Sequence, residues 1–109
     1  MAEVKKILGQ VALAAAAQVD VYTVPASTQV VGSSVVFCNT SGANRTFKLS
    51  VAIAGALDTP SQYLYFNEPL PKDRSYIATI GITLGAGDII RAEASGVGVS
   101  VNVFGVEVS

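Results

Sequence analysis

Apolar and polar residues alternate with a period of two through most of this chain. The clearest case is the stretch 45–54, where apolar residues occupy every second position from Phe47 to Ile53. Successive side chains of a strand point to opposite faces, so this pattern predicts a β-strand with one face on a core. Similar stretches, separated by turn residues, occur at 19–24, 29–39, 62–66, 75–84, 89–95 and 97–108. The pattern predicts an all-β fold, a β-sandwich or jelly roll of seven to eight short antiparallel strands, with residues 19–109 as its single domain.

The last of these stretches changes phase near its end. Valines occupy every second position from Val97 to Val103, and Val106 and Val108 then take the opposite phase. A change of phase beside Gly105 predicts a β-bulge or burial on both faces of the strand. A proline-containing segment, 68–73, is expected to be irregular because proline disrupts a strand.

Residues 1–18 are predicted to form an extended N-terminal arm. Apolar residues lie at odd positions from Val11 to Val21, which is typical of a strand, whereas the alanine run 14–17 favours a short helix by propensity. The alternation favours the extended form, and the helix is the alternative. An extended arm can add a strand to another subunit. The residues expected to make subunit contacts in the arm are Ile7, Leu8, Val11 and Leu13.

The same segment superficially resembles a secretory signal peptide. Lys5 and Lys6 precede an apolar stretch that ends in alanines, but Glu3 lies among the leading residues and Gly9 and Gln10 interrupt the stretch. We therefore expect no signal peptide, and a secreted bacterial domain is the alternative. The uncharged run 7–19 is also too short and polar to span a bilayer, so no membrane partner is expected.

Composition adds an expectation of contact with other subunits. Hydrophobic residues make up 50% of the chain and charged residues only 14%, where about 25% charged is usual. A small domain with so few charges has apolar residues to spare for interfaces. The net charge of −1 gives nucleic-acid binding no electrostatic basis.

The sequence offers little for catalysis or metal binding. Histidine is absent, which excludes histidine-centred triads and histidine metal ligands. The single cysteine, Cys38, is expected to be a buried, inert thiol. The glycine-rich segment 81–87 does not match a phosphate-binding loop, and no acidic residues have calcium-loop spacing. We expect no enzyme activity, no catalytic residues, no metal and no cofactor; a small enzyme or metal-binding domain is a remote alternative.

An aromatic group stands out among the remaining residues. Tyr63, Tyr65 and Phe66 are close in sequence, with Tyr76 nearby. Tyrosine and phenylalanine are common in interface cores, so we interpret the group as interface or core, with the first three as predicted subunit-interface residues. A carbohydrate-binding face is the functional alternative.

Four short segments carry a resemblance to a known group of proteins. They are Tyr-Thr-Val-Pro-Ala at 22–26, a strand ending in asparagine at 35–39, Leu-Gly-Ala-Gly-Asp-Ile-Ile at 84–90, and Gly-Val-Glu at 105–107. In this order they resemble small virion proteins of tailed bacteriophages, over about residues 11–107. The resemblance implies a β-sandwich framework and supplies no catalytic residues.

The resemblance further implies a structural role in the virion. Such proteins occur as head-decoration or cement proteins and as neck or tail components. The expected partners are other virion proteins, namely capsid or tail subunits, and further copies of the chain as a homo-oligomer. The protein would be made in the cytoplasm of the bacterial host. A carbohydrate- or receptor-binding module of a phage fibre is the alternative.

Overall fold

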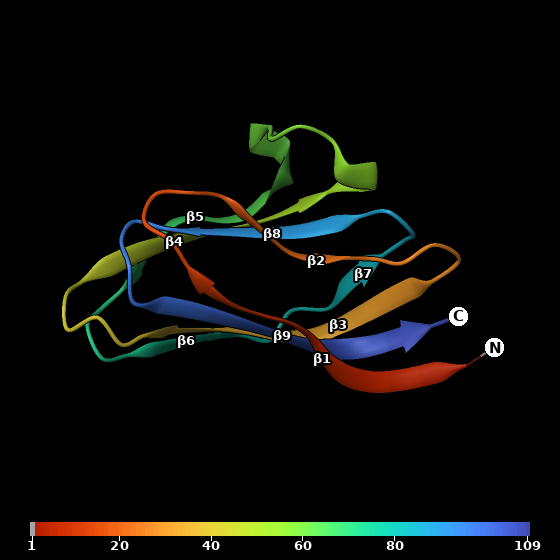
Figure 1. The fold of residues 1–109 in the computed structure, drawn as a ribbon, viewed down its shortest axis with the longest axis horizontal. Helices are drawn as coiled ribbons and strands as arrows, with labels where there is room; N and C mark the ends of the chain where they lie inside the picture. The colour runs from red at the N-terminus through yellow and green to blue at the C-terminus, as the bar shows by residue number, and fades with distance from the viewer. Residues whose placement is uncertain (1) are drawn as a thin grey trace.

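Two antiparallel sheets packed face to face form the protein in a computed structural model, which describes residues 2–109 (Figure 1). The strands are β1 (Glu3–Leu13), β2 (Val19–Thr23), β3 (Gln29–Asn39), β4 (Arg45–Ala52), β5 (Tyr63–Leu70), β6 (Ser75–Ala78), β7 (Ile82–Leu84), β8 (Ile89–Ala94) and β9 (Val99–Val108). Two short 3-10 turns, η1 (Ile53–Gly55) and η2 (Pro60–Gln62), lie between β4 and β5. The predicted all-β sandwich is confirmed.

The strand order is that of a jelly roll. One sheet, here the β9 sheet, has the order β1-β9-β3-β6, with β7 also paired to β3; the other, the β8 sheet, has the order β2-β8-β4-β5. With β6 and β7 counted as one interrupted strand, each sheet has four strands and the chain passes repeatedly from one sheet to the other. Two interleaved four-stranded sheets of this kind are the jelly-roll architecture.

The structure has nine strands among its described residues, where seven to eight were predicted. The extra strand arises because the predicted strand 75–84 divides into β6 and β7. β6 pairs with Val35–Cys38 of β3, and β7 pairs with Val30–Gly32 of the same strand. Residues 79–81, which connect β6 to β7, do not pair with β3. The proline segment was also expected to be irregular, but β5 continues through Pro69 to Leu70. β5 is an edge strand, where a proline needs no second partner.

The core lies between the two sheets and follows the predicted alternation. Phe37 of β3 and Phe47 of β4 stack at 4.0 Å between ring centroids, joining the sheets. Cys38, predicted to be buried, is half-buried because it follows the inward Phe37 and faces outward. Ile53 was predicted to continue the buried face of β4, but it is 79% exposed because the strand ends at Ala52.

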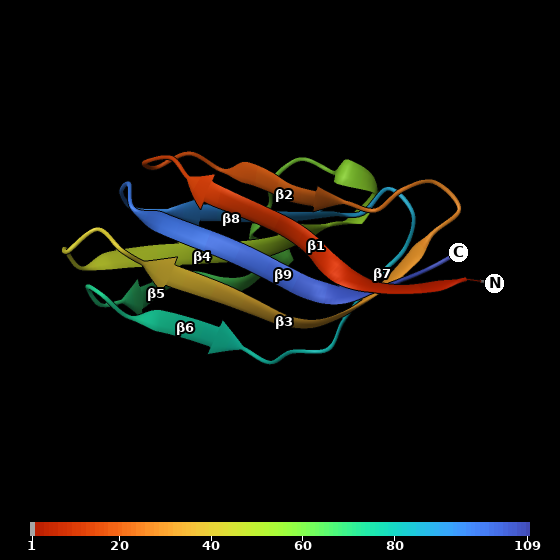
Figure 2. The ribbon, with the colours of Figure 1, turned by 60° about the horizontal axis from the view of Figure 1, so that its bottom comes forward.

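The two N-terminal leucines of β1 belong to this core. β1 pairs with β9 of its own chain from Glu3–Val108 to Leu13–Val99 and forms an edge of the β9 sheet (Figure 2). The predicted extended conformation is confirmed for these residues. Leu8 and Leu13 are buried against the sandwich. That residues 1–18 act as an arm on a neighbouring subunit stays a prediction.

β9 itself keeps its alternation through Gly105, which is buried at the next inward position after Val103. Both neighbouring strands contain one extra residue on either side of Phe104: Leu8 of β1 lies opposite the step from Val103 to Phe104, and Ser33 of β3 lies opposite the step from Phe104 to Gly105. The bulges therefore lie in the two partners of β9 rather than in β9 itself. A Cβ atom on Gly105 would lie 2.6 Å from the Val31 carbonyl oxygen and 2.9 Å from the Leu8 Cδ1, so no side chain fits.

Two of the segments quoted above fix turns between strands. The buried Asn39 amide donates to the carbonyl oxygens of Ala43 (2.8 Å) and Leu70 (3.0 Å), which ties the β3–β4 turn to the end of β5. Asp88 accepts a hydrogen bond from the Gly85 amide (2.8 Å) and closes the turn before β8. Both side chains therefore fix turns that connect the strands of the sandwich.

Glu107 links the two sheets at the open side between β1 and β2. The Tyr22 hydroxyl, on the β8 sheet, donates to the Glu107 carboxylate, on the β9 sheet, and Lys6 Nζ lies 3.4 Å from the same carboxylate. Burial and this hydrogen bond raise the pKa of Tyr22. The hydrogen bond from Tyr22, assisted by Lys6, lowers the pKa of Glu107.

Replacing Gly105 by alanine should destabilise the protein. The added methyl group would collide with backbone atoms of β3, and overpacking of this kind costs about 1–3 kcal/mol. Urea unfolding followed by circular dichroism would measure the change. Gly81→Ala is the matched control, because a Cβ there meets nothing within 4 Å. Equal stability of the two variants would contradict the proposed crowding.

Stability should also depend on the ionisation of Glu107. Its pKa is lower in the folded chain than in the unfolded chain, so its contribution is present above the unfolded value and is lost as pH falls through the folded value. Unfolding curves across the acidic range should show this loss. Glu107→Gln should remove that part of the pH dependence, and an unchanged profile in the variant would refute the link.

Candidate interaction surface

The segment 53–62, here called the crest, stands above the outer face of the β8 sheet (Figure 1). It leaves β4 through Ala54 and Gly55, both with positive φ (51° and 71°), which turns the chain sharply away from the sheet. Such angles are costly for most residues and least so for glycine. The pattern of alternation could not indicate this turn.

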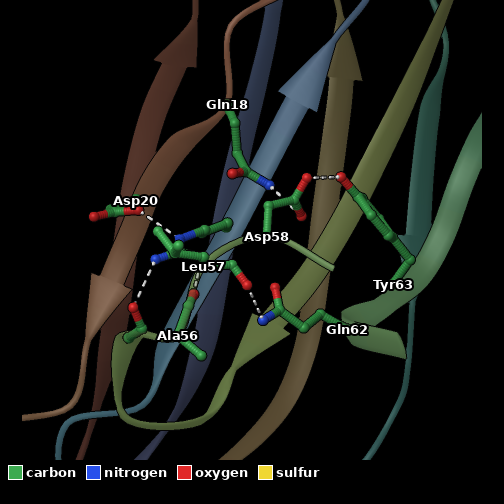
Figure 3. Close-up of polar contacts among 9 residues, drawn as sticks. Gln18, Asp20, Ala56, Leu57, Asp58, Gln62 and Tyr63 are labelled. Carbon is green, nitrogen blue, oxygen red and sulfur yellow. Dashed lines mark hydrogen bonds and ion pairs between the residues drawn. The ribbon is translucent and has the colours of Figure 1, made fainter. Parts of the chain in front are cut away.

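A guanidinium group holds the start of the crest to the sheet. Arg91 of β8 donates from Nη1 to the Ala56 carbonyl oxygen (2.7 Å) and from Nε to the Asp20 carboxylate (3.0 Å) (Figure 3). Its second terminal nitrogen lies 3.4 Å from the Gly55 carbonyl oxygen. The arginine side chain is mostly buried beneath these partners. A planar, permanently charged group suits a site that needs several donors in fixed directions.

Side-chain hydrogen bonds also fix the far end of the crest. Gln62 donates to the Leu57 carbonyl oxygen (2.8 Å), and the Asp58 carboxylate accepts from Tyr63 (2.9 Å) and Gln18 (3.3 Å) (Figure 3). Burial and the bond to Asp58 raise the pKa of Tyr63. Asp88 accepts from the Ala54 amide (2.9 Å) and so connects the crest to the turn before β8.

Apolar side chains cover the outside of this polar scaffold. Leu57 is 86% exposed and Phe66, in the adjacent strand β5, is 59% exposed. Pro60, Tyr63 and Phe66 line a hollow of about 240 Å³, and Lys48 Nζ lies 4.7 Å from the Phe66 ring centre. Exposed apolar groups gathered on a rigid support are typical of an interaction site.

The predicted aromatic group divides between two places. Tyr63 and Phe66 lie on the outer surface with their rings 5.0 Å apart, whereas Tyr65 packs 5.4 Å from Tyr76 and 5.8 Å from Phe47 at the edge of the core. The cause is the irregular pairing of β5, whose register against β4 shifts on both sides of Tyr65. That these three residues contact another subunit stays a prediction.

The outer face of the β9 sheet is a second apolar surface. Across its strands, Ile7 pairs with Phe104, and Val36 pairs with Ile77 on one side and Asn102 on the other. Ile7 is half-exposed, and Val11 faces away from this surface and is half-buried. Leu8 and Leu13 are occupied within the core, so of the four predicted arm residues only Ile7 is open to a partner in this conformation.

Residues 2–109 hold no candidate metal centre on either surface. No group of three metal-ligating His, Cys, Asp or Glu side chains occurs in that range. No helix there is long and apolar enough to cross a membrane.

Comparison with known proteins gives a likeness of fold. No family model and no curated protein matches the chain. Among solved structures, it resembles a protein of the T13 particle of IBDV (TM-score 0.52, 9% identity) and one from infectious bursal disease virus strain Gx (TM-score 0.52, 8% identity). The matches cover 96% and 97% of this chain but only 30% of each viral chain. A pentameric capsid protein from metagenomic phage sequences is matched at TM-score 0.37 and 18% identity, over 96% of this chain and 58% of that one.

Replacing Arg91 by lysine should loosen the crest while leaving the sandwich folded. Lysine cannot reproduce the bonds to both carbonyl groups, and one charged hydrogen bond is worth about 1.5–3 kcal/mol. Limited proteolysis with elastase should cut residues 55–59 about ten-fold faster or more. Arg45→Lys is the control, since Arg45 bonds the Val97 carbonyl oxygen at 3.2 Å, away from the crest. Equal cleavage of both variants would show that Arg91 does not hold the crest.

Proposed function

We propose that this chain is a non-enzymatic structural subunit of a tailed-phage virion, acting as a head-decoration or cement protein or as a neck or tail component. The observation that carries the proposal is the jelly-roll strand order, β1-β9-β3-β6 over β2-β8-β4-β5. Viral capsid domains use this architecture, and so do lectin domains and cupins. The fold alone is therefore compatible with several functions, and the chemistry of the exposed surfaces is needed to distinguish among them.

The contacts of the polar side chains and the exposure of the apolar ones favour a structural role over catalysis. Four of the polar residues with several partners are Asn39, Asp88, Arg91 and Glu107, which bond turns, the crest or the opposite sheet. They stabilise the framework and are already satisfied by it. Several apolar side chains are also left open: Leu57 and Phe66 on one side and Ile7 on the other. Open apolar surfaces fit contacts with neighbouring capsid or tail subunits or with further copies of the chain.

The alternative is a carbohydrate- or receptor-binding module of a phage fibre. One observation favours it: Tyr63 and Phe66 form an exposed aromatic hollow with Pro60. A sugar site also needs several polar groups directed at the ligand. Here the Tyr63 hydroxyl is already bonded to Asp58, which weakens this alternative. Binding to a glycan array that is lost in Phe66→Ala would establish it.

Quantitative mass spectrometry of purified virus particles tests the structural role. If the chain is a virion subunit, its peptides should remain with the particles through density-gradient purification at a fixed ratio to the major capsid protein. A particle protein made in the bacterial cytoplasm should also be found in the lysate, which serves as the control fraction. Finding the chain only in the soluble fraction, and never with particles, would contradict the proposal.

A further inference from the structure

A lysine-rimmed hollow of about 480 Å³ lies on the outer face of the β9 sheet. Lys5, Lys6, Ile7, Ser33, Phe104, Gly105 and Val106 line it. The hollow lies at the paired bulges of β1 and β3, where the strands depart from regular pairing. The hollow is shallow and open to solvent, so side chains of a partner can rest in it from outside.

The hollow combines apolar walls with positive charge. Ile7 and Phe104 lie opposite each other across β1 and β9 and supply the apolar part. Lys6 is paired with Glu107 at 3.4 Å. Lys5 is exposed and has no salt-bridge partner within residues 2–109. An occupant that buries apolar surface and carries a negative charge would satisfy both features.

The crest has the complementary chemistry. Its most exposed large apolar side chain is Leu57, its only charged residue is Asp58, and Ile53 adds a second exposed apolar side chain. The hydrogen bonds from Gln18 and Tyr63 hold Asp58 beside Leu57. A segment that is already rigid loses little conformational entropy when it binds.

The two features lie on opposite sides of one molecule. The crest stands above the outer face of the β8 sheet (Figure 1), whereas the residues that line the hollow belong to β1, β3 and β9, on the far face of the β9 sheet. The crest of a chain therefore cannot reach the hollow of the same chain. Contact between the two requires a second copy, and a head-to-tail contact of this kind produces rings or open filaments.

We propose that the crest of one copy packs into the lysine-rimmed hollow of the next copy, with Leu57 against Ile7 and Phe104 and with Asp58 near Lys5. The inference rests on the proposed structural role and names the surfaces through which copies of this chain associate. It commits to a second copy as the occupant of the hollow.

Native mass spectrometry of two complementary variants tests the contact. Leu57→Arg places a positive charge on the crest against the lysines, and Ile7→Glu places a negative charge in the hollow against Asp58. Each residue is well exposed, at 86% and 50%, so both variants should fold, as circular dichroism would verify. Lys5→Glu is a second hollow variant, and Val97→Arg, at an exposed site in the β8–β9 turn, is the control.

The expected result is association of the wild type and of Val97→Arg, with each crest or hollow variant alone monomeric. An equimolar mixture of Leu57→Arg and Ile7→Glu should form complexes of 1:1 composition, because each complex pairs an intact crest with an intact hollow. A contact between two crests, or between two β9 sheets, would not be restored by mixing.

Three results would overturn the proposed contact. In the first, the wild type associates but the mixture of the two variants stays monomeric. In the second, Leu57→Arg associates as well as the wild type does. In the third, the wild type stays monomeric up to about 1 mM, a concentration at which even a contact with a millimolar dissociation constant would be half occupied. The last result leaves the proposed structural role standing if the chain is found on purified particles, because a decoration subunit could bind a different protein.

Discussion

The pairing of β9 with both β1 and β3 is the constraint on which the rest of the structure depends. β1 is the first and β9 the last strand of the described residues, so the β9 sheet forms only when these two distant segments lie side by side. Three backbones approach one another at Gly105, and a Cβ there would collide with Val31 and with Leu8. The bulges that accommodate this approach place Leu8 in the core and leave Ile7 outside beside Phe104.

The second sheet is organised around a different need. Its outer face supports the crest, and Arg91 supplies donors for the carbonyl groups that a turn leaves without partners. Backbone groups satisfied in this way allow the turn to stay rigid while Leu57 is exposed. The sandwich thus has an apolar projection on one face and an apolar, lysine-rimmed hollow on the other. This arrangement suits a subunit that meets neighbours on two sides.

Alternation of residue type predicted most of the framework, because every strand buries one face. It predicted the all-β sandwich and the extended N-terminal strand; it also indicated a β-bulge or burial on both faces in the last strand, where the bulges lie instead in its partners β1 and β3. It misplaced Ile53, because the turn at Ala54 and Gly55 depends on contacts with Asp88 and Arg91 that are distant in sequence. Tyr63 and Tyr65 were grouped for a similar reason: register shifts in β5 send them to opposite faces, and local pattern carries no signal for such a shift.

The sequence indicated less about function than about fold. Composition predicted surplus apolar surface but not its location. The resemblance segments around Tyr22, Asp88 and Glu107 proved to contain bonds within the framework, in keeping with a likeness that concerns fold. Hydrogen–deuterium exchange on dilute and on associated protein tests the central claim, that the two outer surfaces perform the function. The account predicts slower exchange in residues 55–59 and around Ile7 and Phe104 on association. Protection confined to other regions, with both of these unchanged, would contradict it.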